Sequence, residues 1–317
     1  VVDDFVREYA AGRTPIPCVR CNSFTKFRDL VRRADALGCE GVATGHYARV
    51  VHRGGAARLA RAADDRKDQT YFLWGVPGDV LERLHLPIGE MRKPDVRAAA
   101  RRLGLVTAEK PESYEICFVP DNDYAGVLRR YLGDDHPALS PGAFVTGDGE
   151  VVGRHGGYAR FTVGQRKGLP GGFPEAMFVT EIRPETREVV IGPRSELAAS
   201  ALRAGGANWL GPRPAPGAEV GVRIRHGAPI VPARVVEAEE DGFALELSLP
   251  QHAVTPGQSA VLYDGDVVLG GGVIHAAAAV RPAAADQCRS PSASASRSRA
   301  SRPSRDSSWG TRITTRT

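Results

Sequence analysis

Cysteines are the most reactive side chains of this sequence, and two of them follow a stiff, proline-rich segment. Cys18 and Cys21 stand in residues 14–22, which read Thr-Pro-Ile-Pro-Cys-Val-Arg-Cys-Asn. Each proline fixes its own φ angle and pushes the residue before it towards extended geometry. Asn22 can cap a helix, and a thiol near the positive end of a helix dipole is favoured as the thiolate. The pattern therefore makes Cys21 a candidate nucleophile.

The spacing Cys18-x-x-Cys21 is compatible with three kinds of chemistry. A structural zinc site usually takes two such pairs, and the sequence has no second one. A thioredoxin-like redox pair stands where a strand opens into a helix, whereas prolines precede this pair. In a third interpretation Cys21 works with Cys117, which lies about a hundred residues downstream, and both stand in loops. Spacing alone leaves these alternatives open.

Helix and strand signals around the thiols indicate an α/β unit. Apolar residues at helical spacing predict a helix over 22–37, ended by Gly38. The apolar run at 41–45 predicts a short buried parallel strand. Ligands in α/β sheets lie beyond the carboxyl ends of strands, so His46 is a candidate site residue. A hydrogen-bonded structural histidine is the alternative.

The rest of the chain divides into segments of different character. We predict a hairpin over 50–63, helix starts after 67–69 and at 93 and 121, a loop at 110–113, and a hairpin over 142–153. Short alternating runs between 201 and 275 predict a small antiparallel barrel. The glycine-bracketed basic loop at 164–169 is either a solvated turn or a phosphate contact. The Ser/Arg-rich residues 281–317 are expected to be disordered.

Composition narrows the class of protein without identifying it. The chain has 317 residues and a net charge of +5, but the segment from Arg289 onwards has seven Arg and one Asp. The remainder is therefore close to neutral, and the charge says little about nucleic-acid binding by the folded part. No segment reads as a signal peptide or membrane span, and five cysteines in so long a chain indicate free thiols in a reducing compartment.

Six motifs occur in the same order in the tRNA-specific 2-thiouridylases, and the chain resembles that family over about residues 5–275. The motifs lie at residues 14–27, 43–47, 67–69, 115–118, 162–169 and 255–258. The resemblance implies a partial, Rossmann-like α/β domain of the PP-loop ATP-pyrophosphatases at 1–132. It further implies a central domain at 133–200 and a C-terminal antiparallel β-barrel at 201–280, followed by the tail.

The activity implied by the resemblance is sulfur transfer to the wobble uridine of tRNA. The family uses ATP, with Mg²⁺, to adenylate the uridine O2, and no protein-bound metal is expected. Cys117 would carry a persulfide received from a sulfur-relay donor protein. Cys21 would release the sulfur, and a Cys21–Cys117 disulfide would remain. The implied location is the cytoplasm, with no membrane partner.

The resemblance also implies roles for single residues. Gly45 would lie against ATP, and His46 would contact tRNA near the target base. The base pocket would be lined by Ile16, Pro17 and Cys18, although the family often has Asn in place of Ile16. The remaining expected contacts with the anticodon region of the tRNA are Lys67, Asp68, Gln69, Arg225, His226 and Gln258.

One departure from the family pattern concerns the nucleotide. The family's Ser-Gly-Gly-Val-Asp-Ser loop, which cradles the ATP phosphates, does not occur in these 317 residues, which open on Val1. We therefore expect a chain that begins inside the first domain and that cannot adenylate uridine unaided. A non-catalytic RNA-binding remnant is the alternative from another class of protein. Another PP-loop RNA thiolase, acting on a different base, is the second alternative.

Overall fold

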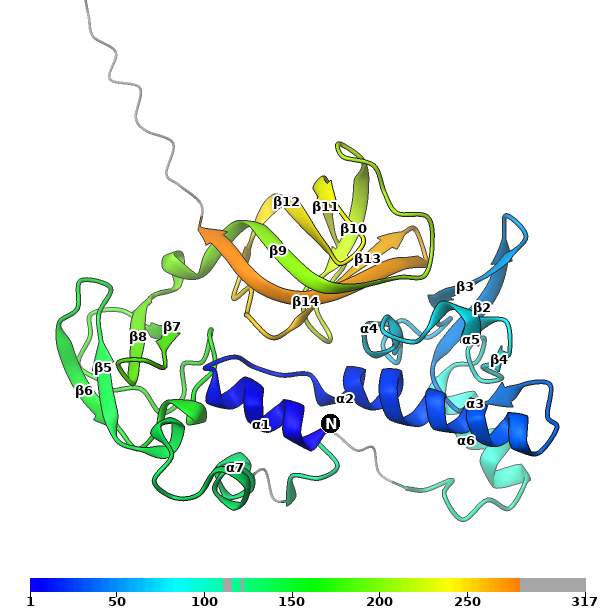
Figure 1. The fold of residues 1–317 in the computed structure, drawn as a ribbon, viewed down its shortest axis with the longest axis horizontal. Coiled ribbons are helices and arrows are strands. Elements are labelled where there is room, and N and C mark those ends of the chain that lie inside the picture. Colours follow the sequence, from blue (N-terminus) through cyan, green and yellow to red (C-terminus); the bar gives the residue numbers. More distant parts are fainter. Residues whose placement is uncertain (111–115, 121–122, 280–317) are drawn as a thin grey trace, which may run out of the picture. The chain divides into compact units, whose positions relative to one another are not determined.

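The protein is described by a computed structural model that covers residues 1–110, 116–120 and 123–279 (Figure 1). Residues 1–280 form one compact unit. Three predictions fall at least partly outside the described residues: most of the loop at 110–113, the helix start at 121–122 and the disordered tail at 281–317. Within the described part no helix is long and apolar enough to cross a membrane.

The thiols Cys18 and Cys21 lie within a helix, which corrects the prediction that this helix begins at Asn22. Helix α1 (Val2–Ala10) is followed by α2 (Pro17–Arg20), the π-helical turn η1 (Cys21–Lys26) and α3 (Phe27–Ala36). The helix begins at Pro17 because a proline at the first position needs no hydrogen-bond partner for its nitrogen. Asn22 does not cap it; its Nδ2 donates to the Phe72 carbonyl at 3.0 Å. Cys21 therefore stands in a helical turn, not in a loop.

The π turn also changes which apolar side chains of the predicted helix are buried. Phe27 and Ala34 are buried, whereas Phe24 is 49% exposed. A π turn holds more residues than an α turn, so it rotates the face before it relative to the face after it. Phe24 therefore leaves the buried stripe, and the guanidinium groups of Arg20 and Arg28 each lie 5.4 Å from its ring centroid.

A short parallel pair of strands carries the loop with His46, as predicted. Strand β1 (Val42–Ala43) pairs in parallel with β4 (Leu84–His85). The surrounding helices are α4 (Thr70–Leu73), α5 (Gly78–Leu81) and α6 (Lys93–Arg102), and the predicted helix starts after Gln69 and at Lys93 are confirmed. Phe27, Tyr71 and Trp74 are central side chains of the core beneath the pair.

The hairpin predicted over 50–63 forms, and it extends the barrel sheet. Strands β2 (Ala48–Arg53) and β3 (Ala56–Arg61) are antiparallel and are joined at Gly54 and Gly55, whose φ angles are 62° and 77°. Two consecutive positive φ angles characterise the hairpin turn that matches strand twist, and glycine adopts them without a steric cost. Strand β3 also pairs with a barrel strand through Ala60 and Val267. This backbone pairing joins the hairpin of strands β2 and β3 to the C-terminal barrel.

The C-terminal barrel is closed, as the strand pattern predicts (Figure 1). Its six strands are β9 (Ala198–Trp209), β10 (Glu219–Arg223), β11 (Val231–Ala238), β12 (Gly242–His252), β13 (Ser259–Asp264) and β14 (Val267–Ala279). Their order is β13-β10-β11-β12-β9-β14, and the β13–β14 pairing closes the ring. Inward-facing side chains such as Leu202, Val235, Leu245 and Ile274 fill it.

A four-stranded sheet lies between the two parts in sequence. Helix α7 (Tyr124–Leu132) is capped by Asp123, whose Oδ1 accepts from the Gly126 amide at 2.8 Å. The sheet has the order β6-β5-β8-β7, formed by β5 (Gly142–Val145), β6 (Val151–His155), β7 (Met177–Arg183) and β8 (Glu188–Pro193). The short helical turns of this part are η3 (Pro137–Leu139), η4 (Tyr158–Arg160) and η5 (Arg194–Leu197). Phe5 of α1 is fully buried in the core of this part.

Candidate functional site

A cavity of about 810 Å³ gathers most of the residues that the sequence singles out. Its walls come from the start of α2, the loop after β1, the segment before α4, and two barrel loops. These segments are far apart in sequence, and the fold brings them to one place. The predicted residues that line it are Ile16, Pro17, Cys18, His46, Lys67, Gln69, His226 and Gln258.

Among the residues that the structure describes, the lining of this cavity carries five cations and no carboxylate. The cations are Lys26, Arg66, Lys67, Lys93 and Lys110. Sequence reasoning named only Lys67 as a site residue. Lys26 lies in the motif at 14–27 but was given no role, and nothing in the local sequence of the other three indicated a shared surface. A cavity lined this way attracts polyanions, because phosphate groups exchange their counterions for fixed cations.

One thiol lines the cavity, and two further cysteines adjoin lining residues in the sequence. Cys18 lines it, Cys21 is half-buried one helical turn further on, and Cys117 is exposed and follows Ile116, which also lines the cavity. All three are free thiols. Burial raises the pKa of the Cys18 thiol; Lys26 opposes this, and the neighbouring thiols of Cys117 and Cys21 raise that pKa further. Cys18 is thus electrostatically coupled to both of the other cysteines.

His46 follows the parallel strand and faces the cavity in its neutral form. Its Nδ1 lies 2.9 Å from Thr44 Oγ1, and its ring lies 5.5 Å from that of Phe27. Burial, and then the charge of Lys26, lower the pKa of His46 to about 4. At neutral pH the ring therefore presents a hydrogen-bonding group without a charge.

The lowered pKa of His46 is expected to appear as a titration midpoint near 4 in an NMR pH series on ¹³C-histidine-labelled protein. An unfolded histidine binds its proton below pH ~6.5. The native state takes up this proton only near pH 4, so His46 lowers stability as the pH falls from 6.5 towards 4. The His46→Gln variant identifies the resonance and should lose this pH dependence. A midpoint at 6.5 or above would contradict the assignment.

Backbone and amide contacts hold the rim of the cavity in place. Gln69 Oε1 accepts from the Tyr47 amide at 2.8 Å, and the Gln69 amide donates to the Tyr47 carbonyl at 2.8 Å. Gln258 Nε2 donates to the Thr14 carbonyl at 3.1 Å. Both glutamines therefore join separate segments of the chain.

Gly45 lies beside the cavity at the carboxyl end of β1. It is exposed, and a Cβ atom built on it would meet no other atom within 4 Å. The backbone is therefore open to a large ligand at the edge where α/β sheets bind nucleotides.

Asp68 is placed differently from the tRNA contact that the resemblance implies. Its side chain is fully buried, and its Oδ2 accepts from Arg223 Nη1 at 2.7 Å. Thr70 Oγ1 donates to the same carboxylate, at 2.8 Å to Oδ2, and lies 3.1 Å from the Tyr263 hydroxyl. A carboxylate enclosed in this way holds the segment before α4 against the barrel and is closed to a ligand.

The barrel contributes the neighbours of Arg223 to the site. Arg225 and His226 are both exposed, and His226 lines the cavity with its ring 4.5 Å from the Phe72 ring. Burial and the charge of Arg223 lower the pKa of His226, while Asp68 opposes them. His226 therefore offers a ring for stacking beside Phe72.

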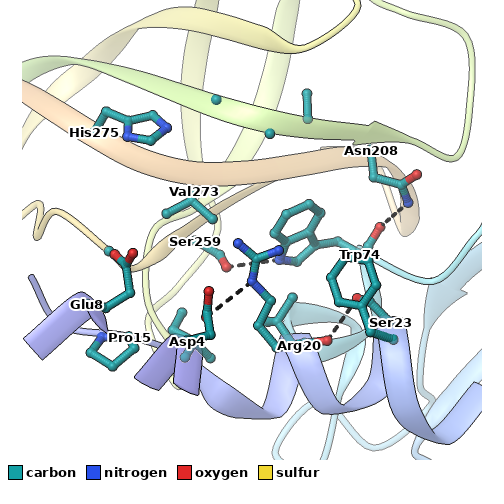
Figure 2. A pocket seen from close by; sticks show the side chains of 18 of the residues that line it. Asp4, Glu8, Pro15, Arg20, Ser23, Trp74, Asn208, Ser259, Val273 and His275 are labelled. Carbon is teal, nitrogen blue, oxygen red and sulfur yellow. Dashed lines mark hydrogen bonds and ion pairs between the residues drawn. The ribbon is translucent and has the colours of Figure 1, made fainter. Parts of the chain in front are cut away.

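A second cavity, of about 520 Å³, shares the lining residues Pro15 and Ile16 with the first, and Figure 2 shows it from close by. Trp74 Nε1 donates to Ser259 Oγ at 2.9 Å, and Asn208 Nδ2 donates to the Trp74 carbonyl at 2.6 Å. Asp4 lies 3.3 Å from Arg20, and Glu8 lies 2.6 Å from Arg13. Two of its three described lining acids, Asp4 and Glu8, are thus paired with arginines, and the third is Asp241. Of the predicted site residues, only Ile16 borders this cavity. In neither cavity, nor elsewhere in the described residues, do three potential metal ligands cluster.

Comparison with known protein families matches three segments of this chain. Residues 1–121 match the tRNA methyl transferase HUP domain, residues 127–193 match the tRNA methyl transferase PRC-barrel domain, and residues 199–274 match the aminomethyltransferase β-barrel domain. HUP domains of this type use ATP.

Three relatives share the name tRNA-specific 2-thiouridylase MnmA. That of Rhizorhabdus wittichii is 50% identical over 280 residues, which cover 87% of this chain and 71% of the relative. The relative from Rhodospirillum centenum is 46% identical, and the match covers 90% of this chain and 74% of that relative. The relative from Carboxydothermus hydrogenoformans is 47% identical, and the match covers 87% of this chain and 75% of that relative. The resemblance read from the motifs is confirmed: this chain belongs to the tRNA-specific 2-thiouridylase family of enzymes.

Proposed function

We propose that this protein replaces O2 of the wobble uridine of tRNA with sulfur, in a reaction that uses ATP. The observation that carries this proposal is the cavity of about 810 Å³, whose described lining combines a thiol, a neutral imidazole and five cations. The cations suit the phosphates of the anticodon loop, and the enclosed part suits a base turned out of its stack. In this proposal Ile16, Pro17 and Cys18 line the base pocket.

The remaining tRNA contacts follow from the positions of the side chains. Lys67, Gln69, His226 and Gln258 line the cavity, and Arg225 is exposed beside it. Neutral His46 donates or accepts a hydrogen bond at the target base. For Asp68 we propose a positioning role, because its carboxylate is enclosed with Arg223.

The open backbone at Gly45 fits the approach of a nucleotide. When bound, ATP, with Mg²⁺, supplies the adenylyl group that turns the uridine O2 into a leaving group. In this chain the exposed Gly45, which follows β1, would lie against the nucleotide. The next residue, His46, lines the cavity and would lie towards the target base.

The sulfur chemistry uses two of the three thiols. A persulfide donor protein of a sulfur relay transfers its terminal sulfur to Cys117, which is exposed to such a partner. The terminal sulfur of the Cys117 persulfide attacks C2, and the activated O2 departs. The Cys21 thiolate then attacks Sγ of Cys117, which breaks the Sγ–sulfur bond. The products are 2-thiouridine and a Cys21–Cys117 disulfide. Reduction of this disulfide after each cycle fits a reducing compartment such as the cytoplasm.

Complementation of a bacterial strain that lacks its own 2-thiouridylase tests this function. The protein is expressed as its natural gene encodes it, and nucleosides from bulk tRNA are analysed by mass spectrometry. The expected result is the return of 2-thiouridine derivatives. Their absence, with tRNA still bound by the purified protein, would favour a non-catalytic RNA-binding protein. Thiolation of another base would favour a different RNA thiolase.

The Lys26→Ala variant is expected to bind tRNA about three- to tenfold more weakly than the wild type, because its ammonium group lies in the cavity lining. The slope of log K against log salt concentration should decrease by roughly 0.7–0.9, the value for one phosphate contact. Filter binding at several salt concentrations measures both quantities. Arg32→Ala is the matched control, since Arg32 is 79% exposed on the adjoining α3 and pairs with Asp29. Equal losses in the two variants would contradict the proposed phosphate contact.

A further inference from the structure

Cys18 is the cysteine in the described lining of the cavity, whereas the proposed sulfur transfer uses Cys21 and Cys117. Cys18 and Cys21 are three residues apart in the continuous helical stretch of α2 and η1. Side chains at this spacing are neighbours, with Cβ atoms about 5–6 Å apart, so a small local adjustment brings two sulfurs into bonding distance. Cys18 also shares the cavity wall with Ile116, the residue before Cys117. Cys18 is therefore one helical turn from Cys21, and it lines the same cavity as the residue that precedes Cys117.

We propose that Cys18 is a resolving thiol that converts the Cys21–Cys117 disulfide into a Cys18–Cys21 disulfide. The proposal rests on the sulfur transfer described above, which generates the Cys21–Cys117 bond. It gives a role to the Cys-x-x-Cys spacing and frees Cys117 for the next persulfide.

The exchange is balanced without any further oxidant. Cys18 loses its proton to solvent, and its thiolate attacks Sγ of Cys21. The Cys21–Cys117 bond breaks, and Cys117 leaves as a thiolate that takes up a proton. A dithiol reductant of the cell then supplies two electrons and two protons to the Cys18–Cys21 disulfide and is itself oxidised to a disulfide. Cys18 is exposed and so accessible to this reductant.

Electrostatics favour the attack after sulfur transfer over an attack before it. Burial raises the pKa of Cys18, and the charges of Cys117 and Cys21 add to this effect. This raised pKa disfavours the Cys18 thiolate before the first disulfide forms. A Cys21–Cys117 disulfide removes the contributions of those two cysteines, and the positive charge of Lys26 continues to favour the Cys18 thiolate.

Disulfide mapping after reaction with glutathione persulfide, without tRNA, tests the exchange. The persulfide loads Cys117, and attack by Cys21 releases hydrosulfide and forms the first disulfide. After acid quenching, alkylation and trypsin digestion, the peptides are analysed by mass spectrometry. Cleavage after Arg13, Arg20 and Lys26 places Cys18 on peptide 14–20 and Cys21 on peptide 21–26, while Cys117 lies on a third peptide. Every pairing therefore has its own mass.

In the wild type we expect the Cys18–Cys21 product to exceed Cys21–Cys117 at least about fivefold, and in Cys18→Ser we expect Cys21–Cys117 to accumulate. Cys39→Ser, which removes an exposed cysteine elsewhere, should behave as the wild type. Cys117→Ser should give no Cys18–Cys21 product, because no first disulfide forms.

Two results would overturn the resolving role while leaving the sulfur transfer intact. One is a wild type that keeps Cys21–Cys117 as the Cys18→Ser variant does. The other is a Cys117→Ser variant that forms Cys18–Cys21 as readily as the wild type, because the pair then oxidises without exchange. Failure of Cys18→Ser to form any Cys21–Cys117 bond would instead refute the proposed sulfur transfer, and the exchange with it.

Discussion

Cys117→Ser is expected to abolish 2-thiouridine formation, with a rate at least about 1,000-fold below that of the wild type. A serine hydroxyl cannot hold a transferable persulfide sulfur, and Cys117 is an exposed thiol that directly follows the cavity-lining residue Ile116. Cys21→Ser is expected to be equally inactive, since the sulfur on Cys117 then has no thiolate to release it. Complementation followed by mass analysis of tRNA nucleosides measures both losses.

The two inactive variants are expected to differ in their sulfur content. After incubation with a persulfide donor, intact-protein mass spectrometry should show one added sulfur on Cys117 in Cys21→Ser and none at that position in Cys117→Ser. Cys39→Ser is the matched control, because Cys39 is exposed and does not line the cavity. Cys18→Ser should complete a first turnover and slow only in later ones. Full activity of Cys117→Ser would refute the assigned sulfur carrier.

Asp68→Asn is expected to lower the free energy of unfolding by about 3–5 kcal/mol, the usual cost of leaving a buried charge without its partner. The Asp68 carboxylate is fully buried, and the Arg223 side chain that it pairs with at 2.7 Å is 8% exposed. Arg223 Nε has no hydrogen-bond partner in the described structure, so the guanidinium depends on Asp68. An amide in place of the carboxylate removes the negative charge and can turn a donor towards the guanidinium. Urea unfolding of both proteins measures the difference.

Loss of the Asp68–Arg223 ion pair is also expected to displace the cavity-lining residues on either side of it. Lys67 and Gln69 flank Asp68, and Arg225 and His226 follow Arg223 closely in sequence, so both wall segments lose their common anchor. We expect tRNA binding to weaken about tenfold at a temperature where the variant remains folded, which corresponds to ~1.4 kcal/mol.

An exposed ion pair in the same region provides the control. Asp65 is 75% exposed and lies 2.7 Å from Arg61, and such surface pairs contribute ~0–1 kcal/mol. Asp65→Asn should therefore leave both stability and tRNA binding nearly unchanged. A double-mutant cycle with Arg223→Met should show strong coupling to Asp68→Asn. Additive effects of the two substitutions would mean that the buried pair does not anchor the wall.

Local sequence determined many of the elements, because their signals lie within a few residues. Proline and apolar spacing place a helix from Lys93, paired glycines place the turn at residues 54–55, and alternation places the barrel strands. The ordered motifs also identified the family, and eight of the site residues they named line one cavity.

The sequence could not determine features that depend on partners distant along the chain. Asp68 reads as an exposed motif residue until Arg223 is placed against it, 155 positions later. Lys93 and Lys110 carry no local signal for RNA binding; only the fold places them beside Lys26 and Lys67 in one cationic lining. The pairing of β3 with β14 likewise needs both ends of the chain.

For the cysteines, sequence determined the residue types and the fold determined their relation. The Cys-x-x-Cys spacing and the motif around Cys117 are visible in the sequence, but spacing alone left open a zinc site, a redox pair and a partnership of Cys21 with Cys117. Tertiary structure starts the helix at Pro17, places Cys18 in the cavity lining, and couples its charge to both Cys21 and Cys117. The physical reason is that burial and Coulomb interactions depend on distance through space, which spacing along the chain does not specify.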